Sequence, residues 1–277
     1  MTPLAHYLAK QLVARPKHRE HSWSDPRRVD HLREWLSDIH CFEVSEVDSL
    51  IGELTEAMMH TQEKTDEIIA EHRFLPAPKT WIEYRYKGRR IATLLQEVPQ
   101  EKLPPNDGVR IEKPAIATFF CEETAMDLGI IPMAGSGRAV VAIKNQIQNE
   151  KILRNFGLPP MEAQAVYAQL ALVLINSPHI IGRRQHVPHA GLERQLTRGL
   201  AGGKFPLHAW TEIKLQVAKP VEIDDGEPHE AHLTGRRALH FVRKHIRIRL
   251  GQLEYVSAHW RGDPSIGIKR SRYIVKP

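Results

Sequence analysis

The chain of 277 residues has little cysteine and few aromatic residues, and it has no long hydrophobic run. Two cysteines, Cys41 and Cys121, are too few for a disulfide framework, and aromatic residues make up 6% of the chain. No apolar run approaches the roughly 20 residues of a membrane-spanning helix, and the first ten residues lack the basic-then-apolar pattern of a secretion signal. We therefore expect a cytoplasmic protein without membrane contact. The 42% hydrophobic and 26% charged residues are typical of a globular protein.

Charge is distributed unevenly along the chain. Residues 1–138 carry 18 basic and 22 acidic side chains, whereas residues 139–277 carry 21 basic and 11 acidic ones. The final stretch from Gly235 to Pro277 holds 11 basic residues and only two acidic ones. A local surplus of this size attracts polyanions such as DNA, RNA or anionic lipid, although it can also be a solvated face that keeps a protein soluble.

The pattern of hydrophobic residues predicts an α+β protein in three parts. Residues 1–75 form an acidic helical part, residues 76–200 a mixed α/β part with a β core, and residues 201–277 a basic, β-rich module. Asp25-Pro26 is typical of a helix start, and Thr80–Tyr86 with Arg90–Leu95 predicts a hairpin around Lys87-Gly88. Glu162–Leu174 predicts a buried helix, and Ser177–His189 is interpreted as a linker.

A second hairpin is predicted in the basic module, from about Val242 to Trp260. Strict alternation from Ile246 to Leu250 favours a strand, and Gly251-Gln252 suits a tight turn, which would place Arg249 beside Glu254. A basic helical stripe over 236–249 is the alternative. Either conformation gathers the cations on one face.

Cations with interleaved aromatic rings are typical of a strand-based surface that binds nucleic acid, because cations neutralise phosphates and flat rings accept bases. Taken singly, Trp260 and Tyr255 are also compatible with a place in the core. The candidate binding residues are Arg183, Arg184, Arg236, Arg237, Arg243, Lys244, Arg247, Arg249, Trp260, Lys269, Arg270 and Arg272.

Catalysis is a second possibility. His245 and His259 have the chemistry of a base and an acid at neutral pH, and Arg261 could stabilise a developing phosphorane charge, as in a metal-independent, toxin-like nuclease. His186/His189 and His229/His232 have the spacing of metal ligands, but a zinc site needs a clear pair of such pairs. The sequence therefore predicts neither a metal nor a cofactor, and it leaves open whether the protein is an enzyme.

Three strings of the sequence carry a family resemblance. Asp38-Ile39-His40-Cys41-Phe42-Glu43, Leu75-Pro76-Ala77-Pro78-Lys79-Thr80-Trp81-Ile82-Glu83 and His259-Trp260-Arg261-Gly262-Asp263 resemble uncharacterised proteins encoded in bacteriophages and prophages of alphaproteobacteria. The resemblance implies a mobile-element origin and a bacterial cytoplasm or virion context. It implies no catalytic residues.

These observations lead to one expectation and two rivals. The leading expectation is a phage or prophage protein that binds DNA or RNA through its basic C-terminal surface. The first rival is the nuclease. The second is an inhibitor of host or defence machinery, or a virion component, that acts by contact with another protein, such as a host protein.

Overall fold

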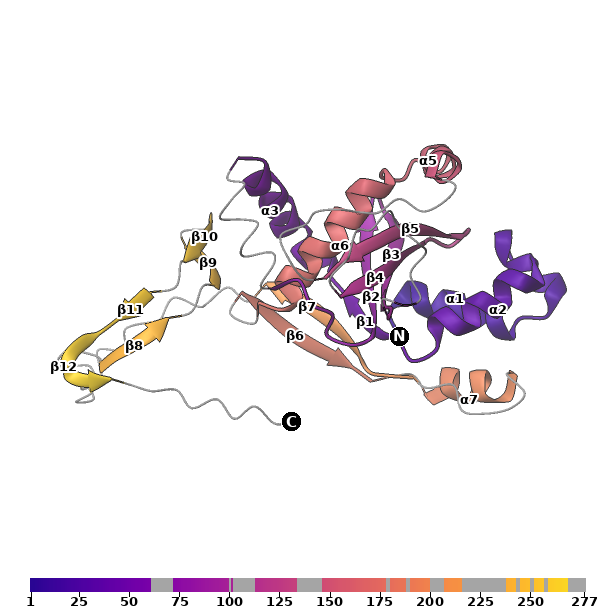
Figure 1. Ribbon diagram of the computed structural model, residues 1–277. Helices are drawn as coiled ribbons and strands as arrows, with labels where there is room; N and C mark the ends of the chain where they lie inside the picture. The colour runs from indigo at the N-terminus through magenta and orange to yellow at the C-terminus, as the bar shows by residue number, and fades with distance from the viewer. Residues whose placement is uncertain are drawn as a thin grey trace. The chain divides into compact units, whose positions relative to one another are not determined.

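The computed structural model describes residues 1–60, 72–99, 101, 113–133, 146–177, 180–187, 190–199, 207–215, 238–242, 245–249, 252–256 and 259–268. The chain divides into two compact units, Met1–Leu215 (unit 1) and Gln216–Pro277 (unit 2), which are described separately below. Helices and a mixed seven-stranded sheet make up unit 1, so the predicted α+β class is confirmed (Figure 1).

The sheet of unit 1 has the strand order β5-β4-β3-β2-β1-β7-β6. Strand β1 runs parallel to both of its neighbours, and the remaining pairs are antiparallel. The strands are β1 (His40–Glu43), β2 (Lys79–Tyr86), β3 (Arg89–Glu97), β4 (Pro114–Phe120), β5 (Ala125–Pro132), β6 (Ile181–His186) and β7 (Trp210–Leu215). The short strand β1 thus joins the meander β2–β5 to the antiparallel pair β6–β7.

Two helices and two short helical turns precede the first strand, and the other helical elements of unit 1 lie between strands. The helices are α1 (Pro3–Val13), α2 (Pro26–Leu36), α3 (Asp48–His60), α5 (Gln146–Asn155), α6 (Met161–Ile175) and α7 (Ala190–Gly199), with 3₁₀ turns η1 (Pro16–His18), η2 (His21–Ser24) and η3 (Ser45–Val47). The predicted start of α2 is confirmed, because the Asp25 side chain accepts a hydrogen bond from the Arg27 amide and Pro26 is the first helical residue.

The predicted hairpin β2–β3 is also confirmed. Lys87 and Gly88 both have positive φ, at 48° and 80°, as a two-residue turn of type I′ requires. Both faces of β2 are buried, because helices cover the sheet on both sides. Tyr84 stacks on Tyr167 of α6 on one face, while Trp81 joins a core cluster with α1, α2 and α7 on the other.

The segment interpreted as a linker contains a strand instead. Residues Ile181–His186 form β6, which pairs with β7 along its whole length and lies at an edge of the sheet. Its burial pattern is that of an edge strand, with Arg183, Arg184 and Gln185 exposed. Within β6 only Ile181 is buried, so polar residues dominate and the sequence lacks the hydrophobic alternation that would have predicted a strand.

Unit 2 consists of short strands. They are β8 (Ala238–Val242), β9 (His245–Arg249), β10 (Gln252–Val256), β11 (His259–Arg261) and β12 (Asp263–Ile268). Strand β8 pairs antiparallel with β11 and parallel with β12, while β9 pairs antiparallel with β10.

The two antiparallel ladders of unit 2 share one register, so the predicted long hairpin is confirmed. The pair Val242–His259 lies three residues before His245 on one strand and three residues after Val256 on the other, as one antiparallel hairpin requires. The predicted register was wrong by two residues: Glu254 lies opposite Arg247, not Arg249. The reason is that β10 already begins at Gln252, and this register gives Arg247 a direct ion pair with Glu254.

Candidate nucleic-acid interface

A cavity of about 640 Å³ lies in unit 2 between its two antiparallel ladders. Strands β9 and β10 contribute Arg247, Arg249 and Val256 to its lining, and β8 and β11 contribute Val242, His259 and Arg261. Four of the residues that the sequence singled out, namely Arg247, Arg249, His259 and Arg261, therefore come together. Two valines complete the lining, so the cavity has a cationic and an apolar portion.

One carboxylate, that of Glu254, interacts with two of these arginines. Arg247 Nε donates to Glu254 Oε2 at 2.8 Å, and Arg249 Nη1 lies 3.9 Å from Glu254 Oε1. The pair is half-exposed, with 42% of the Arg247 side chain and 40% of the Glu254 side chain accessible, so it adds little stability. Its electrostatic effect is mutual: the hydrogen bond to Arg247 lowers the pKa of Glu254, and the same bond raises the pKa of Arg247.

Arg261 has no hydrogen-bond or ion-pair partner within the described part of the chain. Trp260 precedes it in β11 and is 57% exposed, but successive residues of a strand point to opposite faces. Trp260 therefore lies on the other face of β11 from His259 and Arg261. The expected interleaving of this ring with the cations does not extend to the cavity itself.

The remaining candidates divide into two groups. His245 is the first residue of β9, where its backbone pairs with Val256. The candidates that lie outside the described residues are Arg236, Arg237, Arg243, Lys244, Lys269, Arg270 and Arg272.

Arg183 and Arg184 belong to unit 1. Arg183 Nη2 donates to the carbonyl oxygen of Ile175 at 2.6 Å, which ties β6 to the end of α6. Arg184 is exposed and pairs in register with Glu212 of β7. One of the two guanidinium groups thus has a structural contact, while the other faces solvent.

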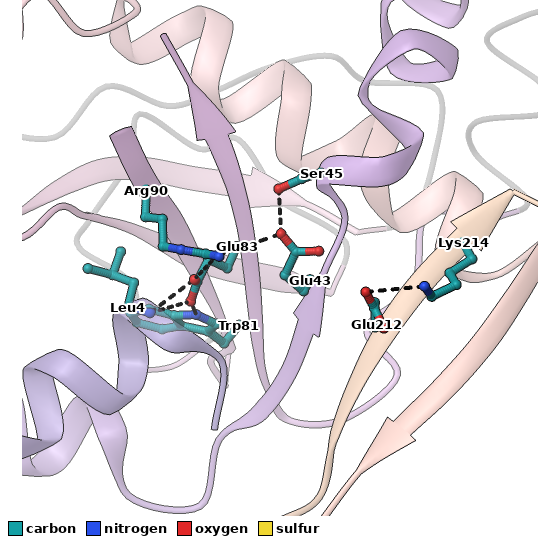
Figure 2. Close-up of polar contacts among 8 residues, drawn as sticks. All are labelled: Leu4, Glu43, Ser45, Trp81, Glu83, Arg90, Glu212 and Lys214. Carbon is teal, nitrogen blue, oxygen red and sulfur yellow. Dashed lines mark hydrogen bonds and ion pairs between the residues drawn. The ribbon is translucent and has the colours of Figure 1, made fainter. Parts of the chain in front are cut away.

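Figure 2 shows a second polar constellation, inside unit 1, that the sequence did not predict. Glu83 of β2 is fully buried, and its carboxylate accepts hydrogen bonds from the Leu4 amide at 3.0 and 3.1 Å and from Trp81 Nε1 at 3.3 Å. Arg90 Nη1 of β3 donates to it at 2.9 Å. Burial raises the pKa of Glu83, and the hydrogen bonds and the Arg90 charge oppose that shift.

Two further carboxylates lie in the same row across the sheet. Glu43 of β1 pairs in register with Glu83 on one side and with Glu212 on the other. Glu43 accepts a short hydrogen bond from the Ser45 hydroxyl and lies 3.7 Å from Arg90, while Lys214 Nζ lies 3.4 Å from Glu212 (Figure 2). Each carboxylate of the row therefore has a cationic partner within unit 1.

Two histidines of unit 1, His186 and His208, each lie within hydrogen-bonding distance of a carboxylate. His186 Nε2 lies 2.9 Å from Glu212 Oε2, and its ring stacks on Trp210. His208 Nε2 lies 2.6 Å from Asp38 Oδ1 and stacks on His40.

These contacts shift two pKa values of that cluster. The hydrogen bond from His208 lowers the pKa of Asp38, while burial and the neighbouring His208 lower that of His40. Among the described residues, no group of three or more His, Cys, Asp or Glu side chains could hold a metal ion.

Comparisons with known proteins add no relative. No family model, no curated protein and no solved structure matches the chain. In the described ranges, no helix is both long and apolar enough to cross a membrane. The functional argument therefore depends on the geometry of the cavity in unit 2.

Proposed function

We propose that unit 2 binds nucleic acid through the arginines of its cavity. The observation that carries the proposal is the convergence of Arg247, Arg249 and Arg261 on one cavity, where Glu254 is the only carboxylate paired with them in the described structure. Among the described side chains, the lining of the cavity therefore carries more positive than negative charge.

Phosphate groups are suited to this arrangement. A guanidinium group offers N–H donors in a planar fork that matches two phosphate oxygens, and it stays charged at any physiological pH. Binding to phosphates also releases counterions, which makes the affinity fall as salt is added. The resemblance to phage and prophage proteins fits such a role, in a bacterial cytoplasm or a virion.

Salt-dependent binding of a labelled strand tests the proposal. A fluorescent single-stranded DNA or RNA is titrated with the wild-type chain and with Arg261→Ala, a substitution that leaves no carboxylate of the described residues unpaired. We expect about tenfold weaker binding, from the loss of one charge-assisted contact, and a salt slope smaller by about 0.7.

Arg27→Ala is the matched control, because Arg27 lies in α2 of unit 1 and its side chain is 89% exposed. The substitution also removes one positive charge, but at a position far in sequence from the cavity residues, so we expect wild-type affinity. Equal affinities for wild-type and Arg261→Ala protein, or binding that ignores salt, would refute the proposal.

Strand cleavage is the second candidate function, because His259 lies in the lining of the same cavity. An imidazole at this place has the chemistry to move a proton to or from a bound phosphodiester. Labelled RNA incubated with saturating protein distinguishes the two functions. Fragments that disappear with His259→Ala identify a nuclease, while a full-length strand identifies a binding protein.

A further inference from the structure

We propose that the cavity of unit 2 selects a phosphomonoester dianion, the group found at a phosphorylated end of a nucleic-acid strand and on a free nucleotide. This inference rests on the proposed function, and it specifies which phosphate the cavity takes.

The shape of the site favours the end of a nucleic-acid strand over the middle of a duplex. The site is a concave, half-open cavity of about 640 Å³ lined by residues of both ladders. This volume is within the range of small-ligand sites, roughly 300–1,000 Å³. A duplex carries its phosphates on a wide convex surface that cannot enter such a space, whereas the last nucleotide of a strand can.

The charge of the lining matches a dianion. Arg247, Arg249 and Arg261 bring three positive charges, and Glu254 neutralises one of them through its contacts with the first two. Among the described side chains of the lining, about two positive charges remain. A phosphomonoester carries about −1.5 to −2 at neutral pH, whereas each internal phosphodiester carries a single negative charge. A terminal phosphomonoester therefore neutralises all of the positive charge that remains in the lining.

Different residues of the cavity lining contact different parts of the ligand. Arg261 comes from β11, whereas Arg247 and Arg249 come from β9, and its guanidinium group has no competing partner among the described side chains. Val242 and Val256 provide apolar surface against which a sugar can pack. We thus expect Arg261 to contribute most to the preference for the dianion.

The test compares one short single strand in three forms: with a 5′ phosphate, with a 3′ phosphate and with two hydroxyl ends. We expect at least one phosphorylated form to bind about tenfold more tightly than the unphosphorylated form. Arg261→Ala should reduce that ratio to near one, while Arg27→Ala in unit 1 should preserve it.

Competition with a nucleoside monophosphate, against the plain nucleoside, identifies the source of the dianion. A monophosphate that competes as well as the phosphorylated strand identifies a free nucleotide, and a much weaker one identifies a strand end. Equal affinity of all three strands would overturn this inference but leave the proposed function standing. If no strand shows salt-dependent binding, both are overturned.

Discussion

The buried charges of unit 1 and the cavity charges of unit 2 are organised in opposite ways. In unit 1, the half-buried Arg90 is held between the buried carboxylates of Glu83 and Glu43. In unit 2, Arg247 and Arg249 share Glu254, and Arg261 of the same cavity has no ion-pair partner among the described residues. Buried charge needs a local partner because water cannot stabilise it, whereas a partly exposed cation without a partner is available to a ligand. The comparison indicates a structural role for the first set and supports the binding role proposed for the second.

Removing the central carboxylate of unit 1 should have the largest effect. Glu83→Ala leaves the Leu4 amide of α1 without its acceptor and leaves the half-buried Arg90 guanidinium with only the more distant Glu43, so we expect the free energy of unfolding of unit 1 to fall by about 3–5 kcal/mol. Urea denaturation followed by tryptophan fluorescence measures the change. Glu53→Ala, an exposed position in α3, is the control and should cost less than 1 kcal/mol. A loss below 1 kcal/mol for Glu83→Ala would show that this network does not hold unit 1 together.

The same arginine-to-alanine change in both units separates the two roles directly. Arg90→Ala should destabilise unit 1 by about 2–4 kcal/mol, because Glu83 and Glu43 lose their shared cation. Arg249→Ala should change stability by less than about 0.5 kcal/mol, because its side chain is 66% exposed, while weakening strand binding severalfold. Denaturation and binding titrations on both variants give the comparison, and similar stability losses in the two would erase the distinction.

Glu254→Gln tests the same comparison by removing a negative charge from the cavity instead of a positive one. The substitution releases Arg247 and Arg249 from their carboxylate and raises the charge of the cavity by one, so we expect about threefold tighter binding of a single strand at low salt. Fluorescence anisotropy measures it. Weaker binding would mean that Glu254 acts mainly by holding Arg247 in place.

A smaller effect concerns the pH dependence of unit 1. The pKa of His40 is lowered in the folded state, so the unfolded chain binds more protons as the pH falls below about 6.5, and stability is lost on acidification. The lowered pKa of Asp38 acts in the same direction, below about pH 4. His40→Gln should reduce the loss of stability between pH 7.5 and 5.5. Denaturation midpoints at the two pH values measure it, and an unchanged difference would show that His40 does not contribute.

Local signals in the sequence account for the elements that were predicted well. The Asp25-Pro26 start of α2 and the Lys87-Gly88 turn depend on neighbouring residues, and the sequence contains all of them. The row of Glu83, Glu43 and Glu212 could not be predicted, because it depends on three strands that are far apart in the sequence and meet only in the sheet.

The site in unit 2 is an intermediate case. Alternation from Ile246 to Leu250 predicted the strand and its charged face, since that periodicity is local. The choice of Arg247 over Arg249 as the partner of Glu254 depends on where the turn lies, and a two-residue shift leaves the alternation unchanged. The convergence of β9 and β11 on one cavity required the structure.

The salt dependence of strand binding by a triple variant tests the central claim most directly. R247A/R249A/R261A is compared with R15A/R27A/R33A, which removes the same charge from exposed positions of unit 1. We predict that the cavity variant lowers the slope of log K against log salt by about 2, from three lost single-strand phosphate contacts, and that the control keeps the wild-type slope. Equal slopes for the cavity variant and the wild-type protein would contradict the assignment of nucleic-acid binding to unit 2.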